Sequence, residues 1–314
     1  MTGRRCAVMA MALRFGIQLA PTADDLETVH ELARRADRDG LDLLGIQDHP
    51  YAPAHVDAFS LIATVLAETE RLTVFPDVAS LPMRGPAMLA KTAASLDRLS
   101  GGRFDLGLGA GGIRPAIRSM GGPDRTDRQA LTALEEGIGI MRAMWRDPAE
   151  RVRLAGDYYS VDGVRGGLAP SRPIGIWVGS LGPRAHALTG RLADGWAAPI
   201  PHYLAYEEWP AAQDRIDAAA RDVGRDPADV LRMAQLVGVV TDGPAERPRL
   251  EGEAPIRTSA GEWARILAEL ATEQRFDTFV FWPEAADQTQ LARWIGEVVP
   301  ATRELLPGDR SLSQ

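Results

Sequence analysis

The sequence predicts an α/β protein that folds as a single (β/α)8 barrel, the TIM barrel. Strand-like and helix-like segments alternate along the whole chain, which is typical of a parallel sheet covered by helices. Eight strand-like segments can be counted, and eight parallel strands close this barrel. A chain of 314 residues has a length at which such barrels occur as one domain. We expect residues 1–12 to form a flexible tail and residues 13–314 to form the barrel.

The expected elements follow one another in regular order. The strands are short and apolar, and the segments between them have the amphipathic spacing of helices. The expected strands are Arg14–Leu19, Leu43–Gln47, Leu72–Ala79, Arg103–Leu108, Gly175–Val178, Gly195–Ala198, Leu231–Val239 and Thr278–Trp282. The expected helices are Asp24–Asp39, Asp57–Glu68, Gly85–Leu99, Thr126–Trp145, Pro183–Leu192, Tyr203–Val223, Gly261–Thr272 and Gln288–Glu304. Pro210 inside the sixth predicts a kink, or a short helix followed by a longer one.

Three insertions interrupt the regular alternation. After the fourth strand, Pro115 and the Gly121-Gly122-Pro123 run delay the next helix until about Thr126. Before the fifth strand, the sequence Leu154–Val161 predicts a small hairpin outside the barrel. After the seventh, residues 241–260 are rich in Pro, Gly and charge. A loop of this length is usually a lid or disordered, so we expect it to lack regular structure and to be mobile without ligand.

Composition and spacing exclude several classes of function. The net charge of −8 and the lack of a basic stripe argue against nucleic acid and anionic membranes as partners. No run of 18 apolar residues could span a membrane. Cys6 is the only cysteine, which excludes a disulfide framework and favours the cytoplasm. The histidines show no H-x-H or H-E-x-x-H spacing, so we expect no metal site, and the G-x-S-x-G nucleophile motif is absent.

A glycine-rich run follows the fourth expected strand. Gly107, Gly109, Gly111 and Gly112 lie where that strand ends, and glycines in this position let a phosphate or a flat ring approach the backbone. A plain glycine-rich surface loop is the alternative. The run also matches the Rossmann pattern G-x-G-x-x-G. We reject that reading because no helix is expected to open on the third glycine and no second strand carries a ribose-binding acid.

The fifth expected strand ends in a second possible anion site. Gly179, Ser180, Leu181 and Gly182 precede a helix that begins at Pro183, and Arg184 adds a positive charge. A simple helix cap is the alternative.

The second expected strand ends in Asp48-His49. A histidine beside a carboxylate at a barrel mouth can donate or accept a proton near neutral pH, so we expect His49 to be catalytic and Asp48 to orient it. A loop histidine that caps the turn before Pro50 is the alternative. These features and the lack of a nucleophile suit a phosphorylated cofactor that brings its own reactivity.

Three motifs in order resemble the bacterial luciferase-like superfamily of flavin- and deazaflavin-dependent oxidoreductases: Gly40–His49, Ala90–Gly111 and Pro173–Trp196. The resemblance implies FMN or the deazaflavin coenzyme F420 across the barrel mouth, with His49 facing the ring. It also implies a non-proline cis peptide behind the ring at Asp77–Val78, followed by Ala79. The loops Gly109-Ala110-Gly111-Gly112 and Gly179–Arg184 would hold the phosphate.

The chain departs from two branches of this superfamily. Gly112 replaces the proton-donating glutamate of its sugar-phosphate dehydrogenases, and no arginine near Ala110 matches the one that holds FMN in luciferases. We expect hydride transfer between the bound cofactor and a small organic substrate, by a protein that forms a homodimer. The alternatives are an FMN- and oxygen-dependent monooxygenase supplied by a separate reductase, and a flavin-binding protein without activity. The lone Lys91, expected within a helix, argues against an aldolase.

Overall fold

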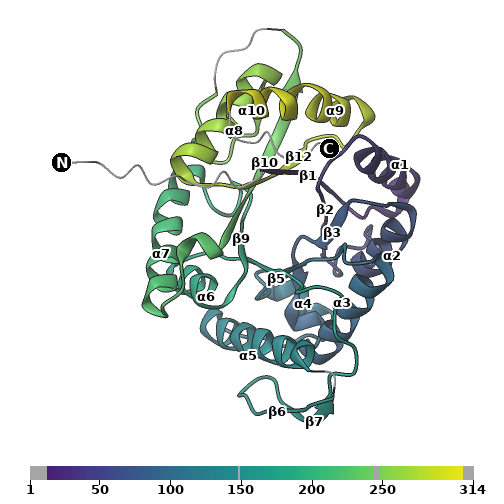
Figure 1. The fold of residues 1–314 in the computed structure, drawn as a ribbon, viewed down its shortest axis with the longest axis vertical. Coiled ribbons are helices and arrows are strands. Elements are labelled where there is room, and N and C mark those ends of the chain that lie inside the picture. The colour runs from purple at the N-terminus through teal and green to yellow at the C-terminus, as the bar shows by residue number, and fades with distance from the viewer. Residues whose placement is uncertain (1–12, 148, 244–247, 307–314) are drawn as a thin grey trace, which may run out of the picture.

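The computed structural model describes residues 13–147, 149–243 and 248–306, which form a barrel of parallel strands surrounded by helices (Figure 1). The strands lie side by side in the order β3-β2-β1-β12-β10-β9-β8-β5-β4. A parallel bridge links Val74 in β3, at one end of this path, to Phe104, just before β5, which is next to the other end. The predicted TIM barrel is therefore confirmed. The predicted tail, residues 1–12, lies outside the described residues.

The bounds of the elements agree with the predicted order. The barrel strands are β1 (Arg14–Leu19), β2 (Leu43–Ile46), β3 (Thr73–Pro76), β4 (Ala79–Ser80), β5 (Leu106–Gly109), β8 (Ile176–Gly179), β9 (Gly195–Ala198), β10 (Leu231–Thr241) and β12 (Thr278–Pro283). The other strands are β6 (Arg151–Leu154), β7 (Val161–Arg165) and β11 (Ile256–Ser259). The α-helices are α1 (Leu26–Arg38), α2 (Ala58–Glu68), α3 (Pro86–Ser100), α4 (Arg114–Ser119), α5 (Asp127–Arg146), α6 (Pro183–Leu192), α7 (Trp209–Asp222), α8 (Ala260–Gln274), α9 (Gln288–Arg293) and α10 (Val299–Leu305). Short helical turns are η1 (Ala23–Asp25), η2 (Leu81–Met83), η3 (Tyr206–Glu208), η4 (Pro227–Asp229) and η5 (Trp294–Val298).

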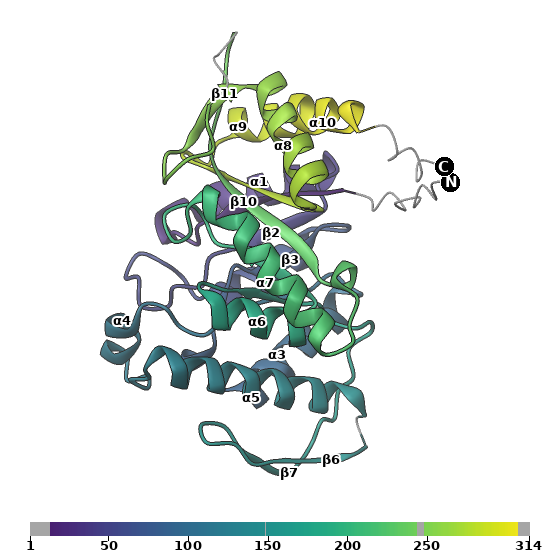
Figure 2. The same ribbon diagram turned by 90° about the vertical axis from the view of Figure 1, so that its left-hand side faces the viewer.

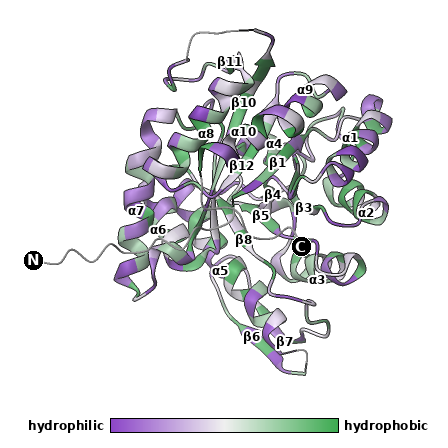
Figure 3. Ribbon diagram, turned by 45° about the horizontal axis from the view of Figure 1, so that its top comes forward, coloured by the Kyte–Doolittle hydropathy of each residue, from purple (hydrophilic) through white to green (hydrophobic). Residues whose placement is uncertain are grey.

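The core has two parts. The larger one fills the space between the strands and the surrounding helices. The smaller one fills the inside of the barrel and consists of large and small apolar side chains from six strands, Leu43, Phe75, Trp177, Ala197, Met233 and Val280. Figure 3 shows the hydrophobic strands at the centre and hydrophilic stretches on the outer turns of α7. The barrel interior is thus a packed core, as in other TIM barrels.

Local sequence signals explain where several helices begin. Thr126 and Gln129 form a capping box at the start of α5, and the Ser259 side chain caps α8. Prolines stand in the first turn of α3, α6 and α7, where a missing N–H costs nothing. Pro210 accordingly starts α7 after the short turn η3, which is the second of the two predicted outcomes.

The structure corrects the predictions at three places. The third predicted strand is divided into β3 and β4, because the chain bulges at Asp77–Val78. The region before Thr126 contains the short helix α4, whose Pro115 lies in the first turn and therefore does not prevent a helix. The segment 241–260 contains β11, which pairs in parallel with β10.

The hairpin predicted near Leu154–Val161 is confirmed as the antiparallel pair β6 and β7. Figure 2 shows it outside the barrel beside α5, and shows α4 and β11 on the side where the barrel strands end. None of the described helices is long and apolar enough to cross a membrane.

Candidate active site

The predicted site residues come from four barrel strands and lie at their carboxyl ends, which we call the mouth. Asp48 and His49 follow β2, Asp77 and Val78 separate β3 from β4, and the two glycine-rich loops follow β5 and β8. Direct contacts join three of these segments, because the Val78 side chain reaches the backbone of both β5 and β8. All parallel strands of a barrel end at one face, so the fold itself gathers these residues.

The peptide bond between Asp77 and Val78 is cis, as the resemblance implies. Val78 packs against glycines of the two neighbouring strands. A Cβ atom built on Gly109 would lie 2.9 Å from Val78 Cγ2, and one built on Gly179 would lie 3.2 Å from the same methyl group. These two glycines therefore make room for the Val78 bulge, which is a structural reason for part of the glycine-rich pattern.

Other glycines of the two loops differ in their surroundings. A Cβ on Gly111 would lie 2.8 Å from Ile117 Cδ1, and Gly111 has a φ of +92°. The fold therefore requires a glycine at this position. By contrast, a Cβ on Gly112 or on Gly182 would meet nothing within 4 Å. Open space beside the backbone, the property expected of an anion site, is thus found at Gly112 and Gly182.

The start of α6 presents free hydrogen-bond donors. The N–H groups of Leu181 and Gly182 have no acceptor among the described residues. The first N–H groups of any helix likewise have no acceptor within the helix itself. Arg184 is exposed, and none of the ion pairs within the described part of the chain involves it. The Ser180 hydroxyl instead faces inward, where it accepts a hydrogen bond from Thr189 Oγ1 at 3.1 Å. Backbone N–H groups and Arg184 are therefore the groups available to an anion here.

His49 is half-buried and lies against Tyr51, with ring centroids 5.3 Å apart and an interplanar angle of 23°. Burial lowers the pKa of His49 below its ordinary value of 6.5, and the nearby His55 lowers it further, while Asp48 opposes this shift. The imidazole is therefore neutral at neutral pH and can accept a proton. Burial raises the pKa of Tyr51 to about 12, so this hydroxyl keeps its proton.

The structure gives Asp48 partners other than His49. Its carboxylate is fully buried and accepts hydrogen bonds from Arg84 Nε at 2.9 Å and Nη2 at 2.8 Å, and from the Ser80 N–H at 3.0 Å. None of the described hydrogen bonds joins it to His49. A planar guanidinium can donate two parallel hydrogen bonds to the two oxygens of a carboxylate. Arg84 therefore occupies the Asp48 oxygens that we expected to orient the imidazole.

The resemblance implied a role for the Asp77–Val78 peptide bond, but the sequence did not indicate that the Asp77 side chain meets Gln235. Gln235 Nε2, in the middle of β10, donates to Asp77 Oδ1 at 3.0 Å. β3 and β10 lie on opposite sides of the barrel, with β2, β1 and β12 between them along the sheet. The pair therefore crosses the barrel interior just below the mouth. Gln235 gave no signal because it lies within a long, mostly apolar strand.

The Asp77 carboxyl is buried and only partly satisfied. Its second oxygen, Oδ2, has no hydrogen-bond partner among the described residues. Burial raises the pKa of Asp77 to about 7, and the Gln235 amide offsets this only in part. Both protonation states of this carboxyl are thus accessible near neutral pH.

The segment 248–255, which we call the rim segment, connects to the neighbouring loop at two points. The Gly252 N–H donates to Glu207 Oε2 at 3.0 Å, and His202 Nδ1 lies 3.1 Å from Glu253 Oε2. Strand β11 then follows. These contacts correct the expectation that the whole 241–260 segment has no regular structure, while residues 244–247 lie outside the described residues.

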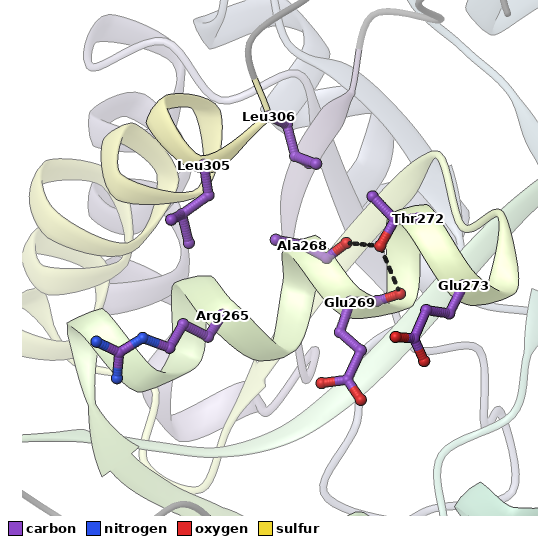
Figure 4. Close-up of a pocket in the computed structure, with 7 residues that line it drawn as sticks. All are labelled: Arg265, Ala268, Glu269, Thr272, Glu273, Leu305 and Leu306. Atoms are coloured by element: carbon purple, nitrogen blue, oxygen red, sulfur yellow. Dashed lines mark hydrogen bonds between the residues drawn. The ribbon is translucent and has the colours of Figure 1, made fainter.

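Two hollows lie away from the mouth. One, of about 440 Å³, lies between α8 and the end of α10, where Thr272 bonds to the carbonyls of Ala268 and Glu269 (Figure 4). The other, of about 720 Å³, lies at the amino ends of the strands beside Arg14 and Trp177. Barrel enzymes place their chemistry at the carboxyl ends, so neither hollow is the candidate active site. No cluster of metal-binding side chains occurs in the described ranges.

Comparison with known proteins agrees with the fold and with the family resemblance. Residues 7–303 match the family model of the luciferase-like monooxygenases. An F420-dependent glucose-6-phosphate dehydrogenase of Nakamurella multipartita is 27% identical, covering 94% of this chain and 98% of the relative. An F420-dependent secondary alcohol dehydrogenase, solved with an F420-acetone adduct, superposes with a TM-score of 0.78 at 18% identity, covering 96% of this chain and all of that one. A riboflavin lyase solved with modified FMN superposes with a TM-score of 0.77 at 17% identity, covering 93% and 92%.

The parallel barrel has the cis bulge at the end of its third strand and the histidine at its mouth that the resemblance to the luciferase-like superfamily implies. The match over nearly the whole chain makes the assignment definite: this chain belongs to the luciferase-like monooxygenase family.

Proposed function

We propose that this protein is an oxidoreductase that binds the deazaflavin coenzyme F420 at the mouth and transfers a hydride between it and a small organic substrate. The observation that carries this proposal is the candidate anion site at the start of α6, where the N–H groups of Leu181 and Gly182 have no acceptor among the described residues and the exposed Arg184 follows in the first turn. Such a site suits the phosphate of a cofactor. F420-dependent relatives support the deazaflavin as that cofactor.

The chain's own residues would hold the cofactor and move one proton. When bound, the deazaflavin ring gives or takes the hydride. Within the predicted loops Gly109–Gly112 and Gly179–Arg184, the open positions Gly112 and Gly182, with Arg184, would hold its phosphate end, and the segment Asp77-Val78-Ala79 would support the ring. The neutral His49 imidazole accepts the hydroxyl proton when an alcohol is oxidised, and returns a proton when a carbonyl is reduced. Tyr51 fixes the plane of this imidazole by lying against it.

The substrate we propose is a small alcohol or carbonyl compound. We do not assign the substrate of the glucose-6-phosphate dehydrogenase relative to this chain, because Gly112 stands where the resemblance expects a proton-donating glutamate. The space beside Gly112 is open, so the missing carboxyl is not replaced by a neighbour touching that position.

A second candidate is an FMN-dependent monooxygenase that receives reduced FMN from a separate reductase. The likeness to the riboflavin lyase that was solved with modified FMN favours it, and the same anion site would take the FMN phosphate. For either candidate the cytoplasmic location and the homodimer remain predictions of the sequence.

The experiment is a pair of titrations with oxidised F420 and with FMN, each followed by fluorescence. We expect F420 to bind more tightly than FMN, and bound F420 to be reduced when a suitable secondary alcohol is added. Tighter binding of FMN, with oxygen consumption by the reduced protein, would favour the monooxygenase. Failure of both cofactors to bind would overturn both candidates.

A further inference from the structure

The hydrogen bond between Asp77 and Gln235 places a buried carboxyl group at the centre of the barrel, directly below the mouth. Below it lie the apolar side chains of the barrel interior, among them Phe75 and Met233. A cofactor bound across the strand ends would therefore lie above this carboxyl. The carboxyl would face the side of the cofactor that points away from solvent. This inference depends on the proposed function, because it assumes that the ring binds at the mouth.

No charged partner compensates this carboxyl. Its Oδ1 accepts from the Gln235 amide, and its Oδ2 has no partner within the described residues. On the β2 side it faces Gly45, where a Cβ would lie only 3.1 Å from Oδ2, so no side chain fits there to pair with it. On the β5 and β8 side the nearest positions are the glycines that receive Val78. The Asp48 carboxylate, at the end of the neighbouring strand β2, is paired with Arg84.

We propose that Asp77 is a positioning residue that sets the redox balance of the bound cofactor through its own charge, favouring the reduced ring when the carboxyl is protonated and disfavouring it when the carboxyl is ionised. Two-electron reduction delivers a hydride to a flavin or deazaflavin ring, and the reduced ring is an anion at neutral to alkaline pH. A carboxylate below such an anion repels it in a water-poor interior. A neutral carboxylic acid does not.

The proton and electron balance of the reaction leaves Asp77 outside the chemical step. The substrate carbon supplies the hydride, its hydroxyl proton goes to His49, and Asp77 exchanges its own proton with solvent. Because burial raises the pKa of Asp77 to about 7, the carboxyl is mostly protonated at pH 5.5 and mostly ionised at pH 8.5. The effect on the cofactor should therefore appear across this interval.

The test compares the midpoint potential of bound cofactor in the native protein and in Asp77→Asn, at pH 5.5 and at pH 8.5. Bound F420 is the probe, or FMN if only FMN binds. Asparagine has the shape of aspartate but stays neutral. We expect equal potentials at pH 5.5. At pH 8.5 we expect the variant to favour the reduced form by about tenfold, the effect of two like charges about 10 Å apart at an effective dielectric constant of about 20. Tenfold corresponds to about 30 mV for a two-electron couple.

The matched control is Asp277→Asn. Asp277 is also buried, with a pKa that burial raises, but it accepts from the Arg232 N–H at the amino end of β10, the far end of the barrel. This variant should leave the pH dependence of the potential unchanged. The proposal would be overturned if the midpoint potential of Asp77→Asn differed from that of the native protein by the same amount at both pH values, or did not differ at either. The proposed function would remain intact.

A second measurement does not need the cofactor. Carbon NMR of the free protein can follow the Asp77 carboxyl resonance, which is assigned by its loss in Asp77→Asn. We expect its chemical shift to titrate near neutral pH. A titration near the ordinary aspartate pKa of about 3.9 would overturn the inference. If neither F420 nor FMN binds the native protein, the proposed function fails and this inference fails with it.

Discussion

The guanidinium of Arg84 makes two parallel hydrogen bonds to the carboxylate of Asp48, at 2.9 and 2.8 Å, and a further bond to Asp57 at 2.5 Å. Arg84 also lies over the Phe59 ring, with its Cζ atom 4.4 Å from the centroid. Asp48 follows β2 and Arg84 follows the turn η2, so this network holds together two loops of the mouth. The Asp48 carboxylate has no exposed surface, while the Arg84 side chain is 21% exposed.

Arg84→Met should therefore destabilise the protein severely. The substitution leaves the buried charge of Asp48 without a cation, which typically costs about 3–5 kcal/mol. The free energy of unfolding in urea measures the loss. The control is Arg34→Met, which removes a half-exposed ion pair with Glu68 and should cost no more than about 1 kcal/mol. A cost for Arg84→Met as small as that of the control would show that Asp48 does not depend on this partner.

His49→Gln should remove the acidic limb of the pH profile. Because burial and His55 lower the pKa of His49 below 6.5, the native imidazole gains a proton only as the pH falls through that lowered value. Alcohol oxidation needs the unprotonated base, so native kcat/KM should rise with pH and level off above the pKa. We expect the variant to be slower by about 10²–10⁴-fold and to lack this limb. A variant with the native rate and profile would make His49 structural.

Gly112→Glu should weaken binding of FMN without unfolding the barrel. A Cβ at Gly112 meets nothing within 4 Å, so the fold can accept the side chain, but its carboxylate would repel a phosphate held by the neighbouring loops. We expect at least a tenfold loss of FMN affinity, about 1.4 kcal/mol, and a much smaller loss for riboflavin, which lacks the phosphate.

The control for this experiment is Gly139→Glu on α5, where a Cβ also meets nothing within 4 Å. It adds the same charge away from the mouth and should change neither affinity. Equal losses for FMN and riboflavin in Gly112→Glu would mean that the phosphate binds elsewhere. Gly109 and Gly179 are unsuitable for this test, because a side chain at either would displace Val78.

The regular parts of this fold were accessible from sequence because each depends on local signals. Pro183 opens α6 at the predicted residue, and the apolar runs of β1 and β9 agree with the predicted strands. The resemblance located the cis bulge at Asp77–Val78.

The errors arise where residues far apart in the chain determine the result. Nothing near Asp48 in the sequence shows that Arg84 will take its carboxylate, so the Asp48-His49 dipeptide was read as a catalytic pair. Similarly, Gly109 and Gly179 suggested a ligand because glycine allows close approach, but the approaching group is the Val78 side chain. Gln235 meets Asp77 across the whole barrel, a contact with a sequence separation of 158 residues.

The rim segment provides the last prediction. Glu207 holds it by accepting from the Gly252 N–H. The hydrogen bond from its own backbone N–H, and next the one from Gly252, lower the pKa of the Glu207 carboxyl below its ordinary value of 4.5. The carboxylate therefore keeps this contact at neutral pH and loses it only as the pH falls through the lowered pKa. Arg249, two residues before Glu251, is well exposed and is a site for trypsin.

Glu207→Gln should increase the rate of tryptic cleavage after Arg249 by about two- to threefold at neutral pH, because a neutral amide oxygen is a weaker acceptor than a carboxylate. The neighbouring Glu208→Gln is the matched control, since none of the described hydrogen bonds or ion pairs involves the Glu208 side chain. Cleavage is followed by mass spectrometry of the native protein and both variants, with and without cofactor and substrate. If the rim segment covers the bound cofactor, ligand should slow cleavage in all three proteins, whereas equal rates with and without ligand would show that it is a fixed part of the barrel edge.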